Sequence, residues 1–257
     1  MSATKPTKSF IDKAAGDMEI HDALEYIEVQ SKLYDLNLEP LKKKYLNLYE
    51  KYKLEKARLE EMSRYEKEGY AKGYVRIGGI DEAGRGPLAG PVVAACVVLK
   101  KDDFIPGIKD SKKMTEKARE SVYEAIMEYA ADFGVGIVDH HTIDDINILN
   151  ATKKAMIEAI GNLKSPPEYL LIDALEIPDY NIPQKSIVKG DNMSVSIAAA
   201  SIVAKVTRDR IMCRYAEEYP CYGFESNKGY GTADHIEAIH KYGICPLHRK
   251  LFVRNFL

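Results

Sequence analysis

The chain has 257 residues, of which 46% are hydrophobic and 30% are charged, and its formal net charge is −2 at pH 7. A chain of this composition can bury a sizeable core and keep a soluble surface, as one large domain or as a domain with an appendage. No apolar run approaches the ~20 residues that a membrane span needs, and the N-terminus lacks the apolar core of a signal peptide.

The cysteines and histidines argue against two further classes of protein. The four cysteines have no CxxC spacing, so we expect reduced, unpaired thiols in a cytoplasmic protein. The six histidines offer no HExxH motif or other paired spacing typical of a metal site. The small net charge says nothing by itself about nucleic acid, because the distribution of charge matters more than its sum.

Residues 1–72 are predicted to form a helical extension of uneven charge. Residues 12–40 hold eight acids and two lysines, whereas residues 41–65 hold eight bases and four acids. Apolar residues recur at helical spacing in both stretches, and Pro40 suits the first turn of the second helix. We favour an antiparallel helical hairpin with opposite charges facing, docked on the main domain. The alternative is a basic helix that contacts nucleic-acid phosphates, but charge runs are usually solvated faces.

After residue 72 the pattern changes to short apolar strands that alternate with amphipathic helices. The expected strands are 75–81, 90–99, 134–139, 169–175 and 185–191, and the expected helices are 115–133, 150–163, 194–219 and 235–242. Thr115 is the expected cap of the first of these helices. Strands mixed with helices of this length predict an α/β domain over residues 73–257, with a buried central sheet.

Three of the expected strands carry an aspartate at or near their end. Asp81 closes the first strand, Asp173 interrupts the fourth and Asp191 closes the fifth, and Glu82 follows Asp81. A buried ionised carboxylate is costly unless it is paired or binds a metal. Oxygen ligands favour a hard ion such as Mg²⁺ or Mn²⁺, and one or two such ions ~4 Å apart serve phosphoryl chemistry.

Each of these acids has a plainer interpretation when it is taken alone. Any of them could cap a helix or pair with a lysine, and Asp191 lies just ahead of the 194–219 helix, where an N-cap is wanted. A regular strand would also direct Asp81 and Glu82 to opposite faces, unless the turn that begins here brings both to one cavity. Taken together, the four acids favour a shared cation.

The segment that follows Glu82 is a glycine-rich turn, AGRGPLAG. Gly84 and Gly86 carry no side chains, so backbone N–H and C=O groups can approach a ligand closely. Arg85 adds a cation suited to phosphate. Glycine-rich turns are common, and it is the acidic pair beside this one that makes the pattern specific.

Several ordered motifs closely resemble ribonuclease HII. They are DEAGRGPLAGP, KDSKKM (109–114), LLIDA (170–174), KGD followed by AAASIVAKVTRD (198–209), and NKGYGTADH (227–235), and the resemblance runs from about Val75 to Phe252. It implies a ribonuclease H-like fold, with a mixed central sheet flanked by helices. It also implies a metal-dependent endonuclease that hydrolyses the RNA strand of RNA–DNA hybrids. A further implied activity is incision of duplex DNA 5′ of a single embedded ribonucleotide, leaving 3′-hydroxyl and 5′-phosphate ends.

The resemblance also implies roles for individual residues. The carboxylates that would bind two Mn²⁺ or Mg²⁺ ions are Asp81, Glu82, Asp173 and Asp191. The turn that would contact the ribose 2′-hydroxyl through its backbone is Gly84, Arg85 and Gly86. Tyr230 matches a tyrosine that packs on the sugar at the RNA–DNA junction, and Lys112 matches a phosphate-contacting lysine. Further candidates for contact with the nucleic-acid backbone are Lys205, Arg208, His248, Arg249 and Lys250, whereas residues 198–201 are interpreted as close helix–sheet packing.

The related ribonuclease HIII carries a different residue in place of the arginine and has a sheet-containing N-terminal domain, so the GRG turn and the helical extension favour HII. We expect a monomer that binds RNA–DNA hybrids and ribonucleotide-containing duplex DNA but no membrane, with a protein partner for the hairpin as a further expectation. Two alternatives stay open. One is a non-catalytic nucleic-acid-binding module, and the other is a protein whose chief role is docking or dimerisation through the hairpin.

Overall fold

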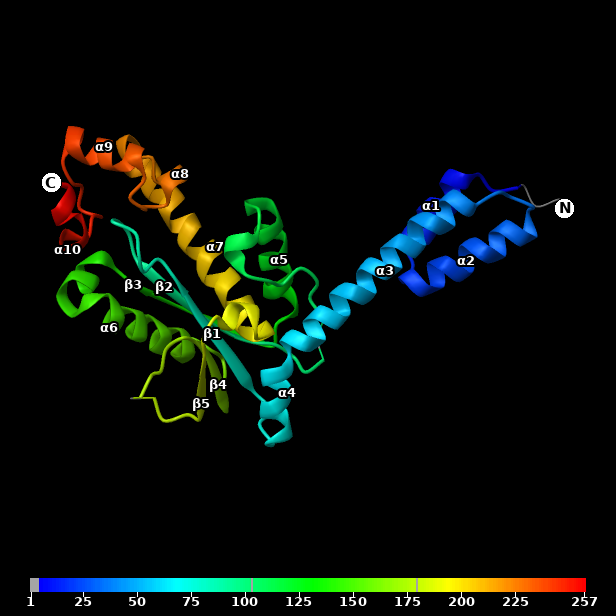
Figure 1. Ribbon diagram of the computed structural model, residues 1–257, viewed down its shortest axis with the longest axis horizontal. Coiled ribbons are helices and arrows are strands. Elements are labelled where there is room, and N and C mark those ends of the chain that lie inside the picture. Colours follow the sequence, from blue (N-terminus) through cyan, green and yellow to red (C-terminus); the bar gives the residue numbers. More distant parts are fainter. Residues whose placement is uncertain (1–4, 103, 179) are drawn as a thin grey trace. The chain divides into compact units, whose positions relative to one another are not determined.

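The computed structural model describes residues 5–102, 104–178 and 180–257. These residues form two compact units, one that ends at Arg58 and one that covers residues 59–257. Figure 1 shows helices alone in the first unit and a sheet with helices around it in the second. Among the described residues, no helix is both long and apolar enough to cross a membrane.

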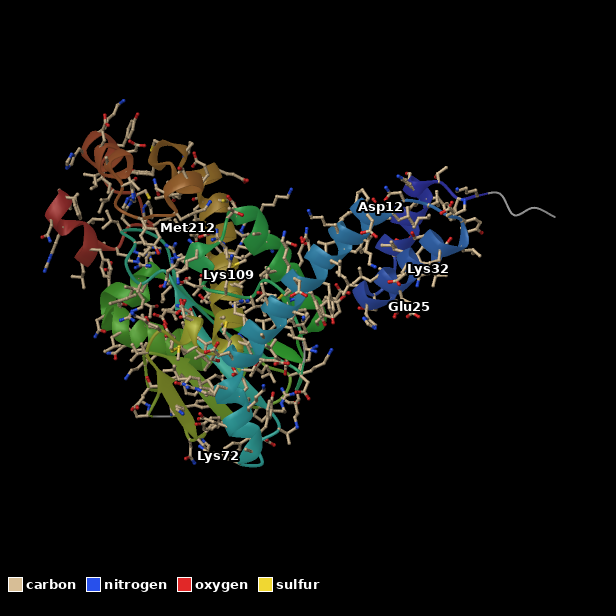
Figure 2. The ribbon with its side chains drawn as sticks, turned by 45° about the vertical axis from the view of Figure 1, so that its right-hand side comes forward. Asp12, Glu25, Lys32, Lys72, Lys109 and Met212 are labelled. Atoms are coloured by element: carbon tan, nitrogen blue, oxygen red, sulfur yellow. The ribbon has the colours of Figure 1, made fainter. Side chains whose placement is uncertain are left out.

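The first unit contains α1 (Lys8–Gly16), α2 (Ile20–Leu33) and most of α3 (Glu39–Met62). The acidic stretch was expected as one helix but forms two, because Gly16 is a poor helix former and ends α1. A small core joins the three helices: Ile11, Ala15, Ala23, Ile27, Leu38 and Tyr45. Lys44 pairs with Asp12 at 2.7 Å, so basic and acidic stretches face each other as predicted (Figure 2 labels Asp12).

The second unit is built on a five-stranded sheet in the order β3-β2-β1-β4-β5. The strands are β1 (Ile77–Ala83), β2 (Val92–Val98), β3 (Asp132–Val138), β4 (Tyr169–Asp173) and β5 (Gln184–Ile187). β2 pairs antiparallel with β1 and β3, whereas β4 pairs parallel with β1 and β5. The sheet is therefore mixed, which confirms the fold class predicted from the sequence.

Helices cover both faces of this sheet (Figure 1). The fully buried strand β2 alternates between them: Ala95 and Val97 pack with α5 (Glu116–Tyr129) and α7 (Val195–Glu218), whereas Ala94 and Cys96 pack with α6 (His140–Gly161). α7 lies so close to β1 that a Cβ at Gly79 would stand 2.1 Å from the backbone of Ser196. Only glycine fits at this contact, which brings α7 against the strand that carries Asp81.

α6 and β5 differ most from the boundaries expected from the sequence. α6 begins ten residues early, at His140, where Asp139 accepts a hydrogen bond from the N–H of Thr142 at 2.7 Å. At Asn147 the backbone leaves helical geometry (φ 65°), and the Asn147 side chain caps the second half of the helix. The strand expected over 185–191 ends at Ile187, and Asp191 lies in the 3₁₀ turn Gly190–Asn192.

The rest of the second unit closes the two ends of the sheet. α8 (Phe224–Asn227), α9 (Ala233–Tyr242) and α10 (Lys250–Val253) form a separate core around Phe224 and Met212. α4 (Arg64–Ala71) belongs to this unit as well, although the extension was expected to run to residue 72. Glu66 on α4 is buried and accepts hydrogen bonds from Ser194 and Ser196 at the start of α7.

Candidate active site

Asp81 and Glu82 both lie within β1, at the end that leads into the glycine-rich turn. Asp81 is 4% exposed, and its Oδ1 accepts a hydrogen bond from the N–H of Glu82 at 2.7 Å. β1 and β4 are parallel and pair as far as Ile80 with Ile172, so Asp173 is the residue of β4 next to Asp81. Neighbouring strands are ~4.8 Å apart, which makes these two aspartates neighbours across the sheet.

Asp191 reaches the same end of the sheet from the 3₁₀ turn after β5. Within this turn Gly190 donates its N–H to Asp173 Oδ1 at 2.6 Å, which places the Asp191 backbone beside β4. The cap of α7 is Ser194, whose hydroxyl accepts from the N–H of Ile197. The plainer interpretation of Asp191, as the cap of this helix, is therefore wrong.

The carboxylates raise one another's pKa. Burial, together with repulsion from Glu82 and Asp173, raises the pKa of Asp81 well above its usual range. Burial also raises the pKa of Glu82, and burial with repulsion from Asp191 raises that of Asp173. These interactions link Asp81, Glu82 and Asp173 with one another, and link Asp191 with Asp173.

Lys112, in the 3₁₀ turn Ser111–Lys113, faces the same group of acids. Burial alone would lower the pKa of Lys112, but attraction to Asp81, Asp191, Asp110 and Asp173 outweighs it and raises the pKa. Lys112 and Arg85, which pairs with Glu82 at 3.2 Å, together do not neutralise four carboxylates. The site therefore keeps an excess of negative charge that a divalent cation would relieve.

The donor set fits a hard divalent cation. Glu82 Oε2 is buried and has no hydrogen-bond partner among the described residues, although a buried carboxylate oxygen normally has one. Carboxylate oxygens are the ligands that Mg²⁺ and Mn²⁺ prefer. Across the described ranges, no three Asp, Glu, His or Cys side chains are already arranged around one point as metal ligands. The four acids are thus neighbours that repel one another rather than a closed coordination shell.

A cavity of about 660 Å³ opens beside this group. Its lining includes Glu82, the turn residues Gly84, Arg85 and Gly86, Lys112 and Tyr230, so one cavity unites six of the nine residues predicted from the sequence. Asp81, Asp173 and Asp191 are not among the residues that line it. Arg85 pairs with Glu82 at 3.2 Å and so holds the turn against the acidic pair.

The two turn glycines are needed for different reasons. Gly84 has a φ of +96°, and a Cβ there would stand 2.1 Å from Nε of the buried Arg208. Gly86 has open space, and the nearest atom to an added Cβ is Cε1 of Tyr230 at 3.9 Å. Gly86 therefore keeps clear the gap in front of the Tyr230 ring, whereas Gly84 permits the turn itself.

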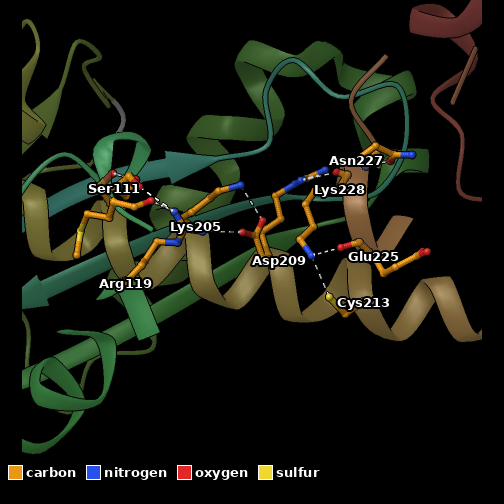
Figure 3. A network of polar contacts seen from close by, with 12 residues as sticks. Ser111, Arg119, Lys205, Asp209, Cys213, Glu225, Asn227 and Lys228 are labelled. Carbon is orange, nitrogen blue, oxygen red and sulfur yellow. Dashed lines mark hydrogen bonds and ion pairs between the residues drawn. The ribbon is translucent and has the colours of Figure 1, made fainter. Parts of the chain in front are cut away.

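Three further polar residues of the cavity were not assigned a site role by the sequence analysis: Ser111, Arg119 and Ser201. Figure 3 shows Arg119 and Lys205 both directed at Asp209, at 3.6 and 2.8 Å. Ser111 is next to Lys112 in the KDSKKM motif, a signal that was available in the sequence. Ser201 was interpreted as packing, but its hydroxyl bonds to Ser111 at 2.9 Å and to Asp81.

Three basic residues that were expected to meet the nucleic-acid backbone are buried instead. Arg208, His248 and Arg249 are at most 2% exposed, so they cannot contact a phosphate. Lys205 lines the cavity and Lys250 is exposed, and for these two the expectation stays a prediction. The hydropathy of the sequence does not predict this burial, because charged residues are expected at the surface.

The fold matches that of two solved archaeal enzymes. The ribonuclease H2 of Pyrococcus horikoshii OT3 superposes with a TM-score of 0.59 at 27% identity, covering 70% of this chain and 96% of its own. The ribonuclease HII of Archaeoglobus fulgidus, solved as a complex with PCNA, gives a TM-score of 0.59 at 29% identity, covering 68% of this chain and 93% of its own. The mixed sheet, with carboxylates at the end of its central strands, is thus that of a ribonuclease H-like hydrolase.

Sequence comparison narrows this class to a family. The family model for ribonuclease HII matches residues 78–255. The ribonuclease HII of Acetivibrio thermocellus is 55% identical over 247 residues, 96% of each chain, and that of Clostridioides difficile is 54% identical over 93% of this chain and 94% of its own. The chain belongs to the ribonuclease HII family. It is therefore a metal-dependent ribonuclease that acts on RNA–DNA hybrids.

Proposed function

We propose that this enzyme also incises duplex DNA on the 5′ side of a single embedded ribonucleotide, leaving 3′-hydroxyl and 5′-phosphate ends. The observation that carries the proposal is the cavity that joins the Gly84–Gly86 turn, the acidic pair and Tyr230. A site of this kind can bind a single ribose next to the carboxylates that would hydrolyse the adjacent phosphodiester bond. The 2′-hydroxyl is the group that lets a protein distinguish RNA from DNA at a given position.

The four carboxylates of the site, Asp81, Glu82, Asp173 and Asp191, would hold two divalent cations, Mn²⁺ or Mg²⁺. When bound, such ions activate a water for attack and stabilise the negative charge that develops on the departing 3′-oxygen. The unpartnered Glu82 Oε2 supports its role as a ligand. The raised pKa of Asp81 supports the same role for this residue. Without a cation, a proton on Asp81 relieves the repulsion between the carboxylates, and a bound cation would take the place of that proton.

The turn and the tyrosine would place the ribonucleotide. Gly84, Arg85 and Gly86 line the cavity with bare backbone, and Tyr230, 42% exposed, stands opposite Gly86. A sugar ring in this gap would lie with its 2′-hydroxyl at the turn and one face on the Tyr230 ring. Lys112, at the same wall, would contact a phosphate of the same strand.

The test uses three labelled duplexes with Mg²⁺ or Mn²⁺: DNA with one internal ribonucleotide, all-DNA, and a long RNA–DNA hybrid. We expect one cut on the 5′ side of the ribonucleotide, none in all-DNA, and loss of cutting with EDTA. Cutting of the hybrid alone would overturn the proposed incision but keep the family activity. No cutting of either ribose-containing substrate by folded protein would leave only a binding module.

A further inference from the structure

Two arginine side chains in the second unit are completely buried without a carboxylate partner. Arg208 on α7 and Arg249 just ahead of α10 are both 0% exposed. Among the described residues, neither is within ion-pair distance of an acid. Burial lowers the pKa of Arg208, and burial with repulsion from Arg208 lowers that of Arg249 to about 9. Burying two unpaired cations side by side costs stability, so a purely structural role is a poor explanation.

Arg249 donates hydrogen bonds only to backbone carbonyls of the glycine-rich segment. Its Nη2 bonds to Gly84 O at 2.6 Å, its Nη1 to Arg85 O at 3.0 Å and its Nε to Gly90 O at 2.9 Å. These charge-assisted bonds pull the carbonyl groups of the turn inward, away from the cavity. The short segment that carries Arg249 is itself fixed to the loop, since Arg249 donates its N–H to Leu88 O at 2.8 Å.

Arg208 holds the other end of the same loop and ties it to the Tyr230 segment. Its Nε bonds to Pro91 O at 2.9 Å and its Nη2 to Ala89 O at 3.1 Å. Its Nη1 bonds to Lys228 O at 2.8 Å, two residues before Tyr230 (Figure 3 shows Lys228 above α7). One guanidinium group therefore fixes the distance between the loop and the segment that carries the tyrosine.

The orientation of the carbonyls determines where the N–H groups of the turn point. In a trans peptide the C=O and the following N–H are antiparallel. Because Gly84 O and Arg85 O point at Arg249, the N–H groups of Arg85 and Gly86 point the opposite way. Within the described residues neither N–H has a hydrogen-bond partner, and both residues line the cavity. Hydrogen bonding of each carbonyl to a cation also polarises the peptide and makes its N–H a stronger donor.

We propose that Arg249 is a positioning residue that aims the N–H groups of Arg85 and Gly86 at the ribose 2′-hydroxyl, and that Arg208 sets the spacing between this turn and Tyr230. This inference rests on the function proposed above and names the buried groups that produce its ribose selectivity. Neither arginine touches the substrate. Both act through the loop.

The experiment measures the ratio of two dissociation constants, for all-DNA duplex and for duplex with one ribonucleotide, in Ca²⁺ to prevent cutting. We expect Arg249→Lys to lower this selectivity ratio about tenfold, because one or two hydrogen bonds to the hydroxyl are misaligned. Affinity for all-DNA should stay within about twofold, since phosphate contacts dominate it. A selectivity ratio equal to that of the wild type would overturn the inference.

The matched control is Arg76→Lys. Arg76 also donates to carbonyls, those of Ser165 and Pro166, and pairs with Asp132, but at the other end of β1. The Arg76→Lys substitution should lower the melting temperature and leave the selectivity ratio unchanged. Combining Arg249→Lys with Gly86→Ala should give less than the sum of their separate effects on selectivity, because both act on one turn. Additive effects would contradict action through the turn.

A measurement on the wild type keeps the inference falsifiable should the arginine variants fail to fold. Amide hydrogen exchange at Arg85 and Gly86 should be fast in the free enzyme, slow with the ribonucleotide duplex and fast with all-DNA. Slow exchange in the free enzyme, or equal protection by both duplexes, would overturn the inference. A wild type that shows no ribose selectivity at all would instead overturn the proposed function.

Discussion

At the scale of single residues, the site consists of groups that destabilise one another. Asp81 is 4% exposed and its pKa is raised by burial and by Glu82, so its ionised form opposes folding in the absence of a cation. Because folding raises this pKa, the contribution of Asp81 to stability is greatest below the unfolded pKa near 3.8. This contribution is lost as the pH rises through the folded pKa. At neutral pH a neutral isostere should therefore be more stable.

We predict that Asp81→Asn lowers hydrolysis of an RNA–DNA hybrid by more than about 100-fold, the upper loss for removing even an outer-shell partner of a metal. Without metal, its melting temperature at pH 7 should rise by about 2–4 °C, as for ~1 kcal/mol in a unit of this size. Thermal melts with and without Mn²⁺ test both points, since the variant should also lose most of the stabilisation by Mn²⁺. Near-normal activity with metal present would show that Asp81 is not a ligand.

The two glycines of the turn should respond differently to alanine. Gly84→Ala places a Cβ 2.1 Å from Arg208 at a φ of +96°, and we expect it to lower the free energy of unfolding by about 2 kcal/mol or more. Gly86→Ala should leave stability within about 0.5 kcal/mol, because its Cβ meets only Tyr230 at 3.9 Å. It should nevertheless reduce kcat/KM on the ribonucleotide duplex about tenfold. Denaturant titration and steady-state kinetics on both variants distinguish these outcomes.

At the scale of elements, the C-terminal segment is joined to the Tyr230 segment by a buried pair of histidines. His235 Nδ1 contacts Tyr230 O at 2.9 Å, and its Nε2 contacts His248 Nε2 at 3.1 Å. Burial, with repulsion from His235 and His140, lowers the pKa of His248 to about 4, and burial lowers that of His235. The folded state therefore requires neutral imidazoles here.

A pH dependence of stability follows from this pair. For a histidine whose pKa is depressed on folding, stability is present above the unfolded pKa of 6.5 and is lost as the pH falls toward 4. We expect His248 to account for a loss of about 2 kcal/mol between pH 7.5 and pH 5. Melting temperatures across this range should fall less steeply for His248→Gln than for the wild type. Parallel curves for the two proteins would show that the pair does not titrate on unfolding.

At the scale of the whole molecule, the N-terminal helices divide between the two units. The compact unit ends at Arg58, so α4 belongs with the sheet even though its sequence continues the helical texture of the extension. The match to the A. thermocellus relative spans 96% of this chain, so it extends into the first unit, whereas the matches to the two archaeal structures span 70% or less. The extension is thus shared within part of the family.

Two truncations should separate these roles. Removing residues 1–58 should leave hybrid hydrolysis within about twofold, because every residue of the cavity and all four carboxylates lie in the second unit. Removing residues 1–72 also deletes Glu66, which accepts from Ser194 and Ser196, and we expect a loss of about 3 kcal/mol or more. Melting temperature and activity of both truncations provide the test. Equal stability of the two would show that α4 contributes little to the sheet unit.

Much of the fold and part of the site could be predicted because they rest on local patterns. Strands with period-two or continuous apolar runs, the cap at Thr115 and the acids at strand ends are all visible in short windows of sequence. The roles of Gly84, Arg85, Gly86 and Tyr230 came from motif resemblance, and their assembly in one cavity agrees with it. The metal and substrate roles of these residues remain predictions.

The α/β class, the four acidic positions and the bare turn beside them could be predicted from the amino-acid sequence, because strand hydropathy, strand-end charge and glycine content act over a few residues. The three-dimensional structure was needed to show that Ser194 rather than Asp191 caps α7, that Glu66 holds α4, and that Arg208 and Arg249 are buried behind the turn. The contacts of Glu66 and Arg249 depend on partners far away in the sequence: Ser194 is 128 residues from Glu66, and Gly84 is 165 residues from Arg249. Whether a charged side chain is buried depends on which distant segments pack over it, and a short stretch of sequence does not contain that information.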